Sequence, residues 1–298
     1  MDPGTPALTS RAVMRYPSAA RLRATAAATA VALPLTVEQL HDESLRDGFV
    51  DGCMLDQRLA RAVAAPYLEA RSQGDARHAV NLQMLRRVLR SAGAQVPVAF
   101  IQVTRDRLLR GLLGELASDY AATGVERVFI RVRGVGEDAS AIEFRAYLEA
   151  LDAFTACAID VVPDCVGRLG PLLVHEGAIG FSTGTMFFRT VAAPLLAKGG
   201  GAGGASVSIE SSDGWCEIPR DSDQVATMEP CPEPGCRAGT PYAELDDLRE
   251  HRLHTLARLA REAAERDTGD LIRSLRSSGQ ARAREQAEVL AERHRRVA

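Results

Sequence analysis

The sequence predicts an α/β fold built on a parallel sheet, because short apolar segments alternate with amphipathic stretches over its first two thirds. The apolar segments are continuous rather than alternating with polar residues, as in parallel strands covered on both faces. Repeated units of this kind build a doubly wound sheet or a TIM-type (β/α) barrel, and we expect a barrel, complete or incomplete. Its strands are predicted at 49–55, 97–103, 126–132, 157–162 and 178–181.

The helices between these strands are predicted from their apolar periodicity. The first begins near Thr36, which can cap the opening turn because its hydroxyl oxygen accepts a hydrogen bond from a backbone N–H. In the later helices apolar residues recur three and four positions apart, so each helix has one face to bury. These helices are predicted at 58–70, 76–91, 107–122 and 141–154, with a short one near 169–175.

The chain divides into three regions by composition. Residues 1–33 are expected to be a loosely ordered leader, because Pro, Ser, Thr and an alanine run leave little periodic pattern. Residues 34–197 form the predicted barrel-like domain, and 198–298 a C-terminal zinc-binding subdomain with a loop and helices. The glycine-rich stretch 198–204 lacks the strand–turn–helix context of a nucleotide-binding motif, so we expect it to be a flexible loop.

The composition is typical of a soluble globular protein, with 298 residues of which 46% are hydrophobic and 25% charged. No apolar run reaches the roughly eighteen residues that a membrane span requires, so no membrane partner is expected. The six cysteines are scattered, unlike a secreted disulfide framework, which favours a reducing cytoplasm. A net charge of −3 gives no overall basic surface for nucleic acid.

Polar residues lie at the carboxyl ends of the predicted strands, at the edge where a barrel carries its chemistry. Several such side chains meeting at one rim would form a ligand site. Each aspartate taken alone could instead cap the helix that follows it, so only the set as a whole indicates a site. The set comprises Asp56, Gln102, Arg133, Gly134, Gly136, Asp164, Ser182 and Thr183.

Two cysteines and two histidines form a candidate metal site. Cys231 and Cys236 are separated by four residues of a proline-rich loop, and His251 and His254 follow at the start of an amphipathic helix. Thiolate sulfur and imidazole nitrogen are the usual protein ligands of zinc. The alternative is a proline-stiffened loop with incidental cysteines beside a surface helix.

Taken together, these motifs resemble the tRNA-guanine transglycosylase family over residues 35–267. That family combines a (β/α)8 barrel with a C-x-C-x2-C zinc motif and a later histidine. Cys231 and Cys236 have the spacing of its outer cysteines, and His251 matches its histidine. The resemblance implies a structural zinc, because four protein ligands leave no open position on the metal. The remaining ligand is one of Glu233, Cys216 and His254.

The resemblance also implies roles for the strand-end residues. Asp56 and Gln102 match the aspartate and glutamine with which the family recognises its base, and 132–136 matches its glycine-rich recognition loop, here with Gly134 and Gly136. A carboxylate accepts hydrogen bonds from the N1–H and amino group of a guanine-like base, while an amide donates to its O6. These residues are therefore expected to bind a guanine or 7-deazaguanine base.

Two departures from the family put its chemistry in question. Ser182 stands where the family has a nucleophilic aspartate, and a serine without an activating base is a poor nucleophile. Asp164, at the neighbouring strand end, is the best replacement carboxylate. The chain also begins too late for the family's first barrel strands. The barrel is therefore expected to stay open, or to be completed by the leader or by another chain.

Three functional interpretations follow. The chain could be a divergent transglycosylase that exchanges a base in tRNA or DNA through a covalent glycosyl intermediate, with Asp164 or Ser182 near the sugar. It could instead be a base- or nucleic-acid-binding module of the same fold, or a zinc-binding, non-catalytic subunit in a homodimer or in a heterodimer with a catalytic homologue. The third interpretation is an unrelated α/β barrel with a zinc loop.

Overall fold

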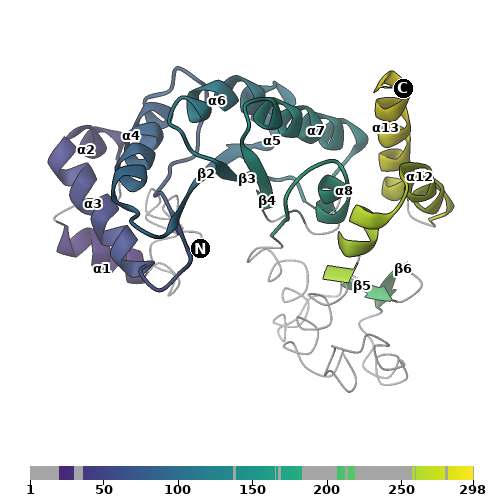
Figure 1. Ribbon diagram of the computed structural model, residues 1–298, viewed down its shortest axis with the longest axis horizontal. Helices are drawn as coiled ribbons and strands as arrows, with labels where there is room; N and C mark the ends of the chain where they lie inside the picture. Colours follow the sequence, from purple (N-terminus) through teal and green to yellow (C-terminus); the bar gives the residue numbers. More distant parts are fainter. Residues whose placement is uncertain are drawn as a thin grey trace, which may run out of the picture. The chain divides into compact units, whose positions relative to one another are not determined.

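The structure, a computed structural model (Figure 1), divides into two compact units. The first contains the chain up to residue 135 together with 142–164 and 178–180, and the second contains 136–141, 165–177 and the chain from residue 181 onward. Among the described helices, none is long and apolar enough to cross a membrane. The described residues are 20–29, 36–136, 139–164, 166, 169–182, 207–211, 214–218, 257–258, 260–278 and 281–297.

The first unit begins with three helices, and capping side chains set the starts of the second and the third. Thr36 caps the second helix as predicted: its hydroxyl accepts a hydrogen bond from the backbone N–H of Gln39, whose side chain accepts one from the N–H of Thr36. Asp42 caps the third helix by accepting from the backbone N–H of Leu45. The three helices are α1 (Ala20–Ala28), which lies within the predicted leader, α2 (Val37–His41) and α3 (Glu43–Asp56).

A four-stranded parallel sheet follows, in the sequential order β1-β2-β3-β4. Its register aligns Gln102 of β2 with Arg131 of β3, and Arg131 with Asp164 of β4. The sheet confirms the predicted α/β class, but the described strands form an open sheet and not a closed barrel. The strands are β1 (Ala62–Ala64), β2 (Val96–Thr104), β3 (Arg127–Arg133) and β4 (Asp160–Asp164); the helices between them are α4 (Ala76–Ser91), α5 (Arg105–Leu109), α6 (Leu112–Ala121) and α7 (Ala141–Ala156).

Several predicted elements are wrong. Residues 49–55 belong to helix α3 and not to a strand. Residues 58–70 contain β1 and an extended segment rather than a helix; Pro66 lies in this segment and is incompatible with a helix interior. Residues 178–181 form no strand. The helix predicted at 107–122 is two helices, interrupted at Gly111, whose φ of 79° favours glycine.

The two faces of the sheet differ in character. In Figure 1, helices α4, α6 and α7 lie on one side of β2, β3 and β4, and the phenol of Tyr147 on α7 donates a 2.7 Å hydrogen bond to the carbonyl of Ile130 on β3. Side chains alternate along β3 between this covered face and the opposite one. Buried Val128, Ile130 and Val132 alternate with the more exposed Phe129, Arg131 and Arg133.

Three aromatic rings stack on the face opposite the helices. The ring of Phe100 lies 5.3 Å from that of Tyr67 and 4.8 Å from that of Phe129, with interplanar angles of 13° and 14°. Ala64 and Val98 complete this apolar layer. Because Gln102 and Arg131 each follow by two residues on the same face, the apolar layer supports a polar layer nearer the carboxyl ends of the strands.

The second unit is mainly helical among its described residues. The predicted short helix near 169–175 is confirmed, and the C-terminal region contains helices as expected. Arg276 and Glu288 join two of these C-terminal helices through hydrogen bonds of 2.8 and 3.0 Å. The elements are α8 (Leu169–His175), α12 (Thr268–Ser277), α13 (Ala281–Val297) and an antiparallel pair, β5 (Val207–Ser211) with β6 (Gly214–Ile218).

The segment after β1 is held by one buried amide. The side-chain oxygen of Asn81 accepts from the backbone N–H of Leu68 at 2.8 Å, and its amide nitrogen donates to the carbonyl of Leu68 at 2.9 Å. We expect Asn81→Leu to lower the free energy of unfolding by about 2–4 kcal/mol in urea denaturation, because two buried backbone groups lose their partners. Arg86→Ala, at an exposed position of the same helix, should change it by less than about 0.5 kcal/mol. Equal effects of the two substitutions would contradict this role.

Candidate functional site

The candidate site is a pocket of about 360 Å³ at the carboxyl ends of β2 and β3, within the first unit. This is the edge of a parallel α/β sheet at which ligands characteristically bind. Its volume falls within the range of small-molecule sites. Its lining residues are Glu69, Ala70, Arg71, Thr104, Asp106, Arg107, Arg110 and Arg133.

A buried ion pair forms part of the polar layer next to the pocket. The guanidinium of Arg131 contacts Asp164 Oδ2, with Nε donating over 2.6 Å, and its NH1 donates to the phenol oxygen of Tyr67 over 3.4 Å. The Asp164 side chain is only 4% exposed. The parallel register brings the two charges together, because it aligns these residues on one face of neighbouring strands. Asp164 is therefore engaged by a cation.

Glu69 supplies the carboxylate that faces the pocket. The segment that carries it runs beside β2, where the backbone N–H of Ala70 donates to the carbonyl of Gln102 at 2.9 Å. Glu69 Oε2 accepts from the side-chain amide of Gln102, and its Oε1 accepts from the guanidinium of Arg133, both at 3.1 Å. A carboxylate oxygen has two lone pairs, so each can accept one further hydrogen bond from a ligand.

Arginines give this pocket its charge. The lining contains four guanidinium groups against the two carboxylates of Glu69 and Asp106. Arg71, Arg107 and Arg110 form no ion pair with another residue that the structure describes, and Arg133 is paired with Glu69 but 66% exposed. Guanidinium groups bind phosphate and carboxylate oxygens through paired N–H donors. The pocket is thus suited to an anionic ligand.

The structure brings together only some of the residues predicted to form the site. Gln102 and Asp164 lie at one edge, together with Arg133. Gly134 has a φ of 88°, so it allows the turn that follows β3. The predicted association of Asp56 with Gln102 is wrong. Asp56 ends helix α3 and accepts a 2.9 Å hydrogen bond from the hydroxyl of Thr25.

Asp56 also lies toward the opposite end of β2. The next residue, Gln57, accepts a hydrogen bond through its carbonyl from the side chain of Gln95, which immediately precedes β2. Gln102, in contrast, is near the carboxyl end of that strand. Glu69 is thus the carboxylate beside Gln102. The signal that could have identified it is Pro66, which excludes the helix predicted over this segment.

The other predicted residues lie in the second unit or outside the described residues. Ser182 accepts a hydrogen bond through its backbone carbonyl from the N–H of Val166, and Gly136 accepts one from Ala139, all within the second unit. Cys216 lies in β6, where only its backbone is described. The remaining candidates fall outside the described residues: Thr183, Cys231, Glu233, Cys236, His251 and His254.

Comparisons with known proteins find no matching family model, no matching curated protein and no matching solved structure. The interpretation of the site therefore depends on the geometry and chemistry of its own residues.

The ion pair of Arg131 and Asp164 should contribute strongly to stability. We expect Asp164→Asn to lower the free energy of unfolding by about 3 kcal/mol, because it leaves a partly buried guanidinium without its counter-charge. A matched control is Asp160→Asn on the same strand. Asp160 pairs with Arg127, and both side chains are more than a third exposed, so the expected cost is below about 1 kcal/mol. Equal losses for the two variants in urea denaturation would contradict this assignment.

Proposed function

We propose that the pocket at the carboxyl edge of the sheet binds a guanine-type nucleotide, with either guanine or a 7-deazaguanine as its base. The observation that carries the proposal is the position of the Glu69 carboxylate beside the Gln102 amide, in a pocket lined by four arginines. Glu69 and Gln102 are complementary to the base of a nucleotide, and the arginines are complementary to its phosphate.

The base is recognised by its hydrogen-bonding edge. The two oxygens of Glu69 accept from the N1–H and the exocyclic amino group of guanine, and the amide of Gln102 or the guanidinium of Arg133 donates to O6. Adenine offers an acceptor at N1 and a donor at its six position, so it presents the opposite pattern to these residues. Binding should therefore discriminate between the two purines.

The phosphate is held by the three arginines that have no ion pair among the described residues. Arg71 follows Glu69 directly in the chain, and Arg107 and Arg110 come from α5 and the turn after it, so cations from two segments surround one pocket. Planar guanidinium groups match the tetrahedral oxygens of phosphate with paired donors. The same chemistry accommodates a free nucleotide or a nucleotide within tRNA or DNA.

Binding is favoured over base exchange by the state of the available carboxylates. A transglycosylase mechanism requires a carboxylate that is free to attack the sugar. Asp164 is buried and engaged by Arg131, which favours a structural role. Base exchange through Asp164 or Ser182 is a narrower proposal, supported by the resemblance of the sequence. In that proposal the zinc at Cys231, Cys236 and His251 is structural, and the chain acts as a homodimer or beside a catalytic homologue.

The barrel is likewise part of the proposal. The strands are parallel and follow one another in sequence order, with α4, α6 and α7 on one side of the sheet. This is the arrangement of a segment of a (β/α) barrel. A doubly wound sheet differs, because it has helices on both faces. Further strands, from this chain or from a partner, would extend the sheet beyond its present edges.

The base assignment predicts purine selectivity. By isothermal titration calorimetry, GMP should bind at least about tenfold more tightly than AMP, because a complementary bidentate edge is worth roughly 1–3 kcal/mol. Glu69→Gln should remove most of this preference, since an amide offers only one acceptor. The fold should survive the change because the Glu69–Arg133 pair is largely exposed on the arginine side. Equal binding of GMP and AMP by the unchanged protein would refute the assignment.

The phosphate assignment predicts a separate effect. Arg110→Ala should weaken GMP binding by about tenfold through loss of a charge-assisted contact, while leaving the affinity for guanosine unchanged. The control is Arg58→Ala, an exposed arginine that precedes β1 at the other end of the sheet, which should leave both affinities unaltered. If Arg110→Ala weakened guanosine and GMP equally, the arginine would not be a phosphate ligand.

A further inference from the structure

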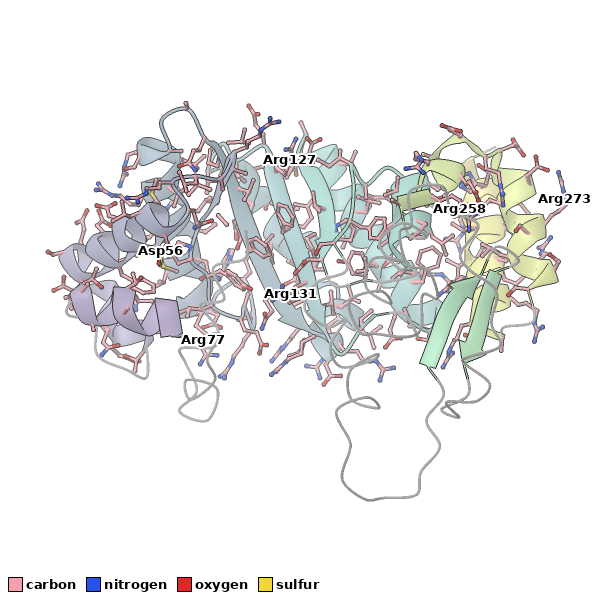
Figure 2. All side chains as sticks on the ribbon, turned by 90° about the horizontal axis from the view of Figure 1, so that it is seen from below. Asp56, Arg77, Arg127, Arg131, Arg258 and Arg273 are labelled. Atoms are coloured by element: carbon pink, nitrogen blue, oxygen red, sulfur yellow. The ribbon has the colours of Figure 1, made fainter. Side chains whose placement is uncertain are left out.

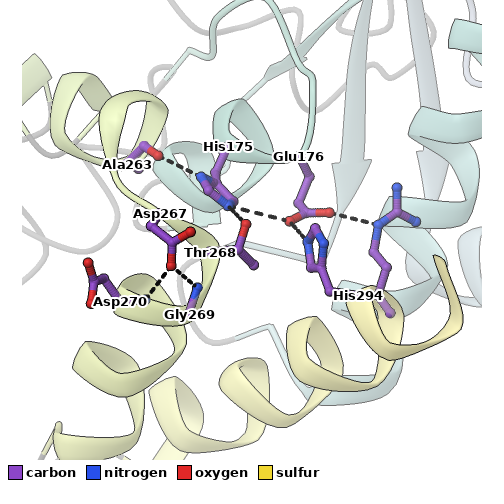
Figure 3. A network of polar contacts seen from close by, with 9 residues as sticks. His175, Glu176, Ala263, Asp267, Thr268, Gly269, Asp270 and His294 are labelled. Atoms are coloured by element: carbon purple, nitrogen blue, oxygen red, sulfur yellow. Dashed lines mark hydrogen bonds and ion pairs between the residues drawn. The ribbon is translucent and has the colours of Figure 1, made fainter. Parts of the chain in front are cut away.

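A cluster of two histidines and one glutamate joins helices α8 and α13 within the second unit (Figure 3). His175 is the last residue of α8, Glu176 follows it, and His294 lies near the end of α13. The nearest side-chain nitrogen or oxygen atoms of these three residues lie within 4.8 Å of one another. We refer to these residues as the His–Glu–His cluster.

The orientation of His175 leaves one ring nitrogen directed into the cluster. Its Nδ1 lies 2.6 Å from the carbonyl oxygen of Ala263. Because a carbonyl can only accept, Nδ1 carries the proton, and in the neutral ring Nε2 is an acceptor, here 3.1 Å from Thr268 Oγ1. A histidine that binds a metal is typically oriented in this way, with its other nitrogen donating to a carbonyl.

Glu176 is a buried carboxylate whose two oxygens contact different partners. Its side chain is 2% exposed; Oε2 accepts from Arg293 Nε at 2.7 Å, and Oε1 lies 2.9 Å from His294 Nε2 and 4.0 Å from His175 Nε2. Arg293 thus holds the carboxylate in place and leaves Oε1 facing both histidines.

We propose that the His–Glu–His cluster binds a divalent transition-metal ion of the zinc type. The ligands are His175 Nε2, Glu176 Oε1 and His294 Nε2. Ligand atoms around a tetrahedral zinc ion are about 3.3 Å apart. The two separations from Oε1 lie on either side of that value, and all three ligand atoms lie within 4.8 Å of one another, so metal binding requires them to move closer together. Two imidazoles select zinc over calcium or magnesium, which prefer oxygen ligands.

The fourth position is available to a hydroxyl or a water molecule. Thr268 Oγ1 lies 3.1 Å from His175 Nε2, at the side of the cluster closest to α12. Three protein ligands with one further position are the arrangement of an accessible zinc site. This metal would join segments 118 residues apart and fix α13 to the end of α8. It is distinct from the zinc predicted at the cysteine loop.

Metal binding can be tested in a protein that lacks the predicted cysteine site. In a Cys231→Ser/Cys236→Ser variant, Co²⁺ should bind with a stoichiometry of one and give visible d–d bands without the sulfur-to-cobalt charge-transfer band of thiolate ligands. Zn²⁺ should displace it and raise the Tm. Adding His294→Gln should weaken Co²⁺ binding at least about tenfold, the smallest effect expected for a direct ligand. Adding His41→Gln, at an exposed histidine of α2, should change nothing.

The outcomes separate a metal site from a salt-bridge cluster. Absence of Co²⁺ binding by the folded double-serine variant, or binding that His294→Gln leaves unaltered, would refute the proposal. Should the double-serine variant fail to fold, the unchanged protein provides the same test. There the cobalt bands without charge transfer must disappear on His294→Gln, while any thiolate band remains.

Discussion

The carboxyl edge of the sheet depends on the contact between Arg131 and Asp164. The parallel register places these residues side by side, and burial of Asp164 makes the guanidinium its necessary counter-charge. Arg131 also reaches Tyr67, which precedes Glu69 by two residues. The same residue therefore links β3, β4 and the segment that carries the pocket carboxylate. Figure 2 shows Arg131 on the sheet. The stacked rings of Tyr67, Phe100 and Phe129 form the apolar layer that precedes Arg131 on the same face of the sheet.

The residues on both sides of Glu69 are fixed by hydrogen bonds. From one side Asn81 satisfies both backbone polar groups of Leu68, and from the other the carbonyl of Gln102 accepts from Ala70. A segment without regular structure is thus fixed at residues on either side of Glu69. Among the arginines of the pocket, Arg71 follows β1, Arg107 and Arg110 follow β2, and Arg133 is the last residue of β3, so they are positioned by the sheet rather than by one another.

Much of the fold could be predicted from the sequence because its central elements follow simple patterns. Helix α4 matches its predicted bounds of 76–91, and the apolar runs of β2, β3 and β4 are found within a few residues of their predicted places. The error at 49–55 has a physical cause. Glycine at position 52 has low helix propensity, yet a Cβ there would lie 2.7 Å from the side chain of Thr25 on α1. The glycine permits close packing of two helices, a tertiary effect that local propensity does not encode.

Part of the site could also be predicted from the sequence, because it lies at the ends of apolar strands. Gln102, Arg133 and Asp164 lie at or near the carboxyl ends of apolar strands, and the parallel arrangement brings these ends to one edge. Asp56 was assigned to that edge only because its helix had been predicted as a strand. Glu69 was missed because β1 has only three residues, Ala-Val-Ala, which are too few for periodicity to distinguish a strand from the helix predicted there. Its place in the sheet depends on pairing with β2, which is a non-local contact.

The most direct measurement is a crystal structure of the protein with bound GMP. The account predicts density in the pocket at the ends of β2 and β3, with the guanine edge within hydrogen-bonding distance of Glu69 and the phosphate against Arg71, Arg107 or Arg110. A nucleotide bound elsewhere on the chain, or one placed here with its base edge turned away from Glu69, would contradict the central claim.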